Sequence, residues 1–113
     1  MASGPWHILG NTVRANLHSG IDLEPVAEAS TIILGNTVHS NGISGIVGTT
    51  ESARTHQALL ILGNHVYSNG GGDSAIGGTE EAGINLFALA GGTALRLLRV
   101  VGNEVHGQRK SAP

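Results

Sequence analysis

The feature that most restricts the fold of this chain is a six-residue pattern that occurs four times. Each copy places a β-branched residue three positions before an asparagine and a valine two positions after it. The spacing between copies grows along the chain while the pattern itself is kept, which is typical of solenoids with insertions in their loops. The four copies are Ile8-Leu9-Gly10-Asn11-Thr12-Val13, Ile33-Leu34-Gly35-Asn36-Thr37-Val38, Ile61-Leu62-Gly63-Asn64-His65-Val66 and Val100-Val101-Gly102-Asn103-Glu104-Val105.

Stacked copies place equivalent residues above one another, because neighbouring parallel strands lie about 4.8 Å apart. β-Branched residues suit such pleated surfaces and are expected to point inward. A Gly-Ile pair after the first two copies supplies a further strand, at Gly20-Ile21 and Gly45-Ile46, and Ala75-Ile76 is taken as the equivalent in the third copy. Insertions are expected after these pairs, at 24–30, 48–56 and 77–92. The predicted inward columns are Ile8, Ile33, Ile61 and Val100; Val13, Val38, Val66 and Val105; and Ile21, Ile46 and Ile76.

The conserved place of one asparagine in every copy predicts an asparagine ladder at a bend. A side-chain amide both donates and accepts hydrogen bonds, so stacked amides can bond to one another and to the corner backbone. Asparagine also tolerates the left-handed conformation that a tight corner requires. The first three copies carry a second asparagine five residues later, and the fourth has Gln108 there. The predicted ladder consists of Asn11, Asn36, Asn64 and Asn103.

This pattern resembles the right-handed parallel β-helix repeat of the pectate-lyase-like superfamily, whose turns read roughly Ile-x-x-Asn-x-Ile-x-x-Asn followed by Gly-Ile. The resemblance covers residues 8 to 107. It implies an all-β solenoid of about four turns, forming one domain over 1–113 or a fragment of a longer solenoid. It implies little about function, because the superfamily contains lyases, hydrolases, epimerases and structural domains. Handedness is taken from the resemblance and from the general bias of parallel crossovers.

Composition supports a narrow aliphatic core. Aromatic residues are only 3% of the chain, and the 18 glycines suit many sharp corners. A net charge of −2 with a single short basic run, Arg109-Lys110, argues against a nucleic-acid partner. With no cysteine there is neither a disulfide nor a thiolate metal site. No segment is predicted to be a signal peptide or a membrane span, so localisation stays open, with export expected if the chain belongs to a longer precursor.

An alternative fold interprets 26–30 and 86–98 as helical, which would give βα units. The insertion at 77–98 is expected to contain a strand or a short helix. A leucine-rich-repeat horseshoe fits less well, because the joints between copies are too uneven.

Four polar residues occupy equivalent positions three after each asparagine and are expected to stack on one outer face. Such a column can contact a sugar ring or an acidic polymer, or it can serve only as mutual packing on a wall. In an enzyme, Tyr67 or His39 would accept a proton and Arg14 would neutralise a uronate carboxylate. His18, His56 and His65 share no column and are interpreted as loop or surface residues. The candidate binding residues are Arg14, His39, Tyr67 and His106.

No catalytic constellation is visible in the chain, so whether it is an enzyme stays open; if it is one, a polysaccharide lyase or epimerase is expected. The acidic residues after the Gly-Ile strands, near Arg54, form either a solvated loop set or a calcium site. Zinc is not expected, because no third ligand is evident in register. The acidic residues concerned are Asp22, Glu24, Glu51, Glu80 and Glu81.

A further column of Leu9, Leu34, Leu62 and Val101 is expected to point away from the inward isoleucines. Three alternatives stay open for this column: the 86–98 segment covers it, another subunit covers it, or the corner turns it inward. Unpaired first and last strands also invite association, so a homo-oligomer is expected through open ends or through this stripe. The three functional hypotheses are a non-catalytic scaffold or polysaccharide-contacting module, a fragment of a carbohydrate-active enzyme, and a self-assembling structural protein.

Overall fold

The described residues fold entirely into strands and loops. The computed structural model describes residues 5–23, 26, 29–50, 56–71, 83–88 and 95–109, and none of these lies in a helix. There is therefore no described helix that could cross a membrane. The strands are β1 (Trp6–Leu9), β2 (Thr12–Arg14), β3 (Ile21–Leu23), β4 (Thr31–Leu34), β5 (Thr37–His39), β6 (Ile46–Thr50), β7 (His56–Leu62), β8 (His65–Tyr67), β9 (Ile84–Ala88), β10 (Leu95–Val101) and β11 (Glu104–His106).

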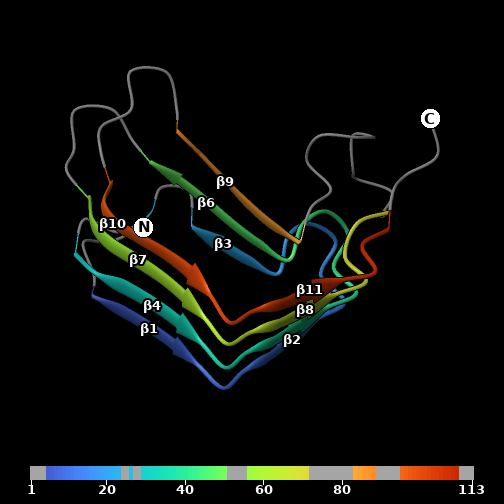
Figure 1. The fold of residues 1–113 in the computed structure, drawn as a ribbon. Helices are drawn as coiled ribbons and strands as arrows, with labels where there is room; N and C mark the ends of the chain where they lie inside the picture. Colours follow the sequence, from blue (N-terminus) through green and yellow to red (C-terminus); the bar gives the residue numbers. More distant parts are fainter. Residues whose placement is uncertain are drawn as a thin grey trace.

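The strands form three sheets in which every pair of neighbours is parallel. The orders are β1-β4-β7-β10, β11-β8-β5-β2 and β3-β6-β9. Figure 1 shows the two four-stranded sheets meeting at a bend and the three-stranded sheet lying across from them. This arrangement confirms the prediction of an all-β chain with stacked parallel strands, and it is compatible with a parallel β-helix.

The strand register follows the sequence repeat. Ile33 is paired with Ile8 on one side and Ile61 on the other, and Val38 lies between Val13 and Val66. The two corresponding columns were predicted, and both face inward. Ile33, Ile61, Val38 and Val66 are fully buried, and they pack in one core with Ile21, Leu23, Val26, Ile46 and Leu59 from the other strands. Burial of aliphatic side chains between three sheets is therefore the main force that holds the chain together.

The third inward column differs from the prediction. Ile46 is paired with Ile21 and with Ile84, not with Ile76. The third Gly-Ile pair is thus Gly83-Ile84, and Ile76 lies outside the described residues. The extra residues of the third repeat therefore lie between Asn69 and Gly83 in the sequence, before the pair, whereas the insertion at 77–92 was predicted to follow it.

The helical alternative for 26–30 and 86–98 is wrong for the residues that the structure describes. Val26 is buried without helical structure, and the later segment contributes parts of β9 and β10. A strand in the 77–98 insertion was one of the two predicted options. In this segment Leu86 faces the core and packs partly against it. The described part of 86–98 therefore consists of strand residues.

Each repeat turns two corners with the same local structure: a residue in the left-handed region followed by an amide residue. At the first corner the left-handed residue is a glycine, such as Gly35 with φ 67°. At the second corner it is Ala15, Ser40, Ser68 or Gly107. The left-handed conformation was expected of the asparagines, but the residue before them adopts it. Glycine has the least steric cost there, and the asparagine is left free to bond along the stack.

The asparagines of the first corner are joined from one repeat to the next by side-chain hydrogen bonds. The backbone N–H and the Nδ2 of Asn36 both donate to Oδ1 of Asn64, at 2.9 and 3.0 Å. Asn64 donates in the same way to Asn103, and Asn11 donates to Asn36. The Nδ2 of Asn64 also donates to the carbonyl of Ile33 on the preceding repeat, at 2.9 Å. Both amide hydrogens of this buried side chain therefore have partners, as burial requires.

A second row of amides follows the same scheme at the other corner. Asn16 donates to Asn41, Asn41 donates to Asn69, and Asn69 donates to Oε1 of Gln108. The partners are 25, 28 and 39 residues apart in the sequence, so the bonds span the insertions of different length. Gln108 thus takes the place of the fourth asparagine. This second row was visible in the sequence as a repeated asparagine but was not assigned a structural role.

The glycine of each Gly-Ile pair is required because the neighbouring repeat approaches its backbone. A Cβ at Gly45 would lie 2.5 Å from Cγ1 of Val66 and 2.6 Å from the carbonyl oxygen of Gly83. A Cβ at Gly20 would meet Val38 and Asn41 in the same way. The Gly-Ile pairs therefore mark positions where the start of the sheet β3-β6-β9 packs closely against residues of the neighbouring repeat. Glycine is needed there for lack of space and not for backbone flexibility.

Candidate functional site

The outer face of the sheet β11-β8-β5-β2 carries the predicted column of polar residues. Arg14 is paired with His39, His39 with Tyr67, and Tyr67 with His106. These four side chains alternate with the inward valines, so strand geometry directs them to the opposite side of the sheet. The structure therefore brings together all four candidate binding residues, in the order that the repeat predicts.

Three of these residues form a stack of rings. The rings of His39 and Tyr67 lie 4.8 Å apart with an interplanar angle of 2°, and those of Tyr67 and His106 lie 5.6 Å apart at 7°. Nδ1 of His39 also makes a hydrogen bond with Oγ of Ser40, at 2.9 Å. Both faces of Tyr67 are thus covered by neighbouring rings. The ring edges, with their nitrogen and hydroxyl groups, remain as the parts that can contact a ligand.

His65 belongs to this face, although it was interpreted as a loop or surface residue without a column. It lies in β8, two residues before Tyr67, and its Cα partners are Thr37 and Glu104. Its ring centroid is 4.5 Å from that of Tyr67. Thr12, Thr37, His65 and Glu104 all occupy the variable position between asparagine and valine in the repeat. That shared position is the sequence signal by which the column could have been found.

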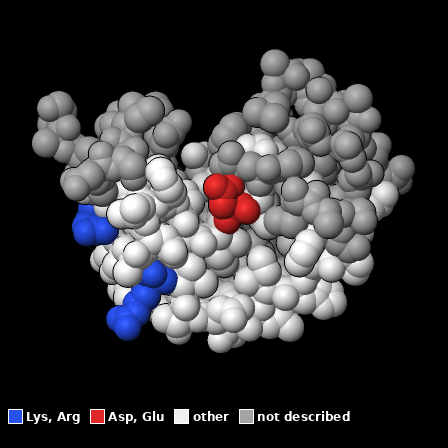
Figure 2. All heavy atoms as spheres, turned by 180° about the vertical axis from the view of Figure 1, so that it is seen from behind, with Lys and Arg blue, Asp and Glu red and all other residues white. Residues whose placement is uncertain are grey.

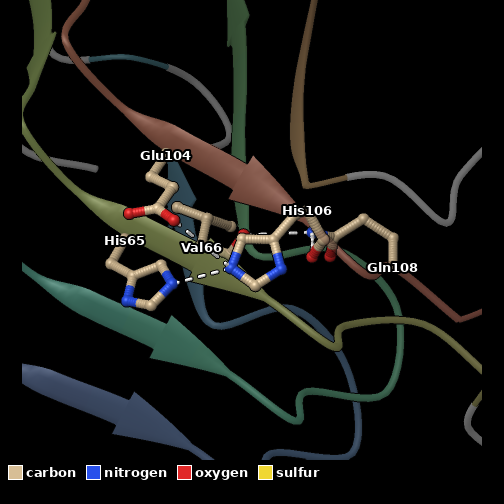
Figure 3. Close-up of polar contacts among 5 residues, drawn as sticks. All are labelled: His65, Val66, Glu104, His106 and Gln108. Carbon is tan, nitrogen blue, oxygen red and sulfur yellow. Dashed lines mark hydrogen bonds and ion pairs between the residues drawn. The ribbon is translucent and has the colours of Figure 1, made fainter.

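The side chains of His65, Glu104 and His106 converge at one end of the sheet. Figure 3 shows the two imidazoles pointing toward one another, with the Glu104 carboxylate on the same side. Nε2 of His65 and Nε2 of His106 are 2.8 Å apart, so one ring donates a hydrogen bond and the other accepts it. Oε1 of Glu104 is 3.9 Å from Nε2 of His106. The sequence did not indicate a third potential metal ligand in register with two histidines. The carboxylate of Glu104 lies close enough to both histidines to be one.

Gln108 holds the strand that carries two of these residues. Its Nε2 donates to the carbonyl of Val66 at 3.1 Å and to the carbonyl of His106 at 2.6 Å. The same side chain accepts from the backbone N–H of Asn69, at 3.1 Å. Residue 108 therefore ties the end of β11 to β8, which keeps His106 beside His65 and Tyr67.

Charged groups are sparse on the described surface. Figure 2 shows a face of mostly uncharged residues with a small acidic group near its middle and basic groups toward one side. Of the five acidic residues considered for calcium, only Asp22 is described; it is exposed on β3. Glu24, Glu51, Glu80 and Glu81 lie outside the described residues, as does Arg54. The calcium hypothesis therefore stays a prediction.

The stripe of Leu9, Leu34, Leu62 and Val101 runs across the sheet β1-β4-β7-β10 in register. Leu9, Leu34 and Val101 are 52%, 44% and 56% exposed. The alternative that the corner turns this position inward is therefore wrong. Residues 89–94 of the 86–98 segment lie outside the described residues, so cover by that segment stays a prediction. Of its described residues, Leu86 packs against the core. Cover by another subunit stays a prediction.

Comparison with known proteins identified no relative of this chain. No protein-family model, curated protein or solved structure matches the chain. Membership of the pectate-lyase-like superfamily accordingly stays a prediction from the repeat.

Proposed function

We propose that the chain forms a non-catalytic, right-handed parallel β-helix module that contacts an acidic polysaccharide along the outer face of β11-β8-β5-β2. In this proposal the two rows of amides are ladders that hold the corners of a solenoid. The observation that carries the proposal is the in-register column of Arg14, His39, Tyr67 and His106. Four parallel strands set these side chains in a line at intervals of about 4.8 Å, so an extended polymer that runs across the strands can meet each of them in turn.

The chemistry of the column favours polar and ionic contacts over stacking on sugar rings. Tyr67 lies between His39 and His106, so its faces are not free for a sugar. The exposed Arg14 can pair with a carboxylate through its planar guanidinium, which suits a uronate residue. Hydrogen bonds from imidazole nitrogen and phenol oxygen atoms at the ring edges would then follow the polymer along the column.

The test is binding of acidic polysaccharides, such as pectate and alginate, to the wild-type chain and to R14A and H39A. We expect weak binding that decreases as salt is added, because salt screens ionic attraction. Binding should also fall several-fold in both variants, because each loses one contact of the column. R99A is the matched control: it removes the same charge from an exposed residue of β10, outside the column. Equal loss of binding in R14A and R99A would mean that net charge, not the column, recruits the polymer.

The same mixtures distinguish a module from an enzyme. New ultraviolet absorbance from unsaturated sugar ends, with or without calcium, would favour the lyase hypothesis, in which Tyr67 or His39 accepts the proton. Unchanged absorbance with retained binding supports a non-catalytic module.

A second candidate function is self-assembly, and a specific observation favours it. The leucine stripe is exposed, and the last repeat presents Val100 and Val105 at 44% exposure, whereas their equivalents Ile61 and Val66 are fully buried. Exposed apolar columns and open strand edges both favour association with another chain.

Light scattering as a function of concentration tests this candidate. L34K introduces a charge in the middle of the stripe, on a side chain that already faces solvent, and should shift a concentration-dependent oligomer toward monomer. Thr12→Lys, an exposed change of the same charge on another sheet, should leave the oligomer unchanged. A wild-type chain that stays monomeric at high concentration rejects self-assembly.

A further inference from the structure

We propose that His65, Glu104 and His106 form a binding site for a divalent transition metal, with Zn²⁺ as the expected ion. The three side chains come from neighbouring parallel strands: His65 from β8, and Glu104 and His106 from β11. His65 is the Cα partner of Glu104, and Glu104 and His106 are two residues apart on one strand. Strand alternation therefore directs all three to the same face of the sheet.

The donor atoms are already grouped. One donor atom from each side chain can be chosen so that all three lie within 4.8 Å of one another. In a tetrahedral zinc site with Zn–N bonds of about 2.0–2.1 Å, two ligand nitrogens lie about 3.3 Å apart. The Nε2 atoms of His65 and His106 are 2.8 Å apart, so a small opening of the pair admits the ion. The Glu104 carboxylate is 3.9 Å from Nε2 of His106 and within 4.8 Å of the ligand atom of His65, so this exposed side chain has to move farther inward than the histidines move apart.

The surroundings hold the two imidazoles in place before any ion arrives. The ring of Tyr67 lies against both, with centroid distances of 4.5 Å to His65 and 5.6 Å to His106. Gln108 fixes the backbone of His106 through its carbonyl oxygen. Less side-chain entropy is then lost on binding, which increases the affinity of an otherwise exposed site.

The ligand set selects the class of metal. Two imidazole nitrogens and one carboxylate suit zinc, copper and nickel better than calcium or magnesium, which prefer oxygen ligands. The Glu104 charge offsets part of the charge of the cation. Glu104 and His106 are exposed, with side chains 73% and 54% accessible, so water can occupy the remaining coordination position.

The test is titration of the untagged, metal-free chain with Zn²⁺ by calorimetry, and with Co²⁺ by visible absorption. We expect one ion per chain, a rise of the melting temperature with excess zinc, and the intense visible bands of four-coordinate cobalt. H65A, H106A and E104Q should each weaken zinc binding at least about tenfold. These residues are outside the core, and circular dichroism should confirm that each variant folds.

Two histidine variants serve as matched controls. H18A removes an exposed histidine from a loop, and H39A removes one from the same ring stack but outside the three-residue cluster. Both should bind zinc with wild-type stoichiometry and little change in affinity. The proposal is overturned if the wild-type chain binds neither ion in excess, or if H65A and H106A bind as well as H18A. Polysaccharide binding is measured separately, so failure of either proposal is distinguishable from failure of the other.

Discussion

The backbone N–H and the side-chain amide of Asn36 donate to a single atom, Oδ1 of Asn64 on the next repeat. Asn64 in turn donates to Asn103 and to the carbonyl of Ile33, so it takes part in bonds to both neighbouring repeats. Because Asn36 and Asn64 are each only 1% exposed, water cannot replace a lost partner. The corner therefore depends on the chemistry of the amide, in addition to the apolar core beside it.

Replacing Asn64 with alanine should destabilise the chain strongly. The change removes the acceptor of two donors of Asn36 and leaves the carbonyl of Ile33 without its side-chain donor. Each buried group left unpaired costs about 1–3 kcal/mol, so we expect a loss of about 3 kcal/mol or more in the free energy of unfolding. N11A is the control: this exposed residue only donates in the row, and its loss should cost about 1 kcal/mol or less. Chemical denaturation measures both, and similar costs would contradict a role for burial.

Replacing Gly45 with alanine should also destabilise the chain, for a steric reason. The added methyl group would meet Val66 and the backbone oxygen of Gly83, and forced overpacking typically costs about 1–3 kcal/mol. Gly35 is the comparison: nothing lies within 4 Å of a Cβ there, but its φ of 67° disfavours alanine. Asparagine tolerates that conformation, so G35N should be mild while G45N is severe. A melting temperature of G35N below that of G45N would reject this explanation.

Replacing Thr31 with valine should stabilise the chain. Oγ1 of Thr31 is buried without a hydrogen-bond partner, and the residue itself is 0% exposed. Valine keeps the shape and removes the unsatisfied hydroxyl, which is worth up to about 1 kcal/mol. T12V, at an exposed position of β2, should have little effect. A lower melting temperature for T31V would indicate that the hydroxyl has a partner in solution.

Replacing Tyr67 tests how the ring stack supports the histidines. Y67L removes the ring that packs on His39, His65 and His106, and aromatic pairs of this kind contribute about 0.5–1.5 kcal/mol each. We expect zinc binding to weaken several-fold in Y67L, because both imidazoles gain freedom. Y67F keeps the ring and should bind zinc as the wild-type chain does. Loss of binding in Y67F would instead indicate that the phenol oxygen takes part directly.

Most of the strand arrangement could be predicted from local patterns. The repeat determines which residues lie opposite one another, because a strand that slips by one residue exposes its whole inward column. That is why the columns around Ile33 and Val38, and the outer line from Arg14 to His106, agree with the structure. Gly83-Ile84 has the same two residues as Gly20-Ile21 and Gly45-Ile46. Aligning it with those two pairs would have identified β9 from the sequence.

The placement of the third insertion shows where local patterns were insufficient. Ala75-Ile76 is nearer to the preceding copy than Gly83-Ile84 is, and the extra loop length costs little free energy. The choice is made by packing: Gly83 lies where a Cβ would collide with Val105, so only glycine fits against the last repeat.

The sequence by itself determined the repeat, the inward aliphatic columns and the alignment of Arg14, His39, Tyr67 and His106, because each depends only on the position of a residue within its own copy. Only the tertiary structure decided that His65, Glu104 and His106 direct their donor atoms to one point. The ring of Tyr67 packs against both imidazoles, and Gln108 donates to the carbonyl of Val66 and so holds β11 against β8. The contacts between His65 and His106 and between Gln108 and Val66 join residues 41 and 42 positions apart, and no pattern within a single repeat contains them.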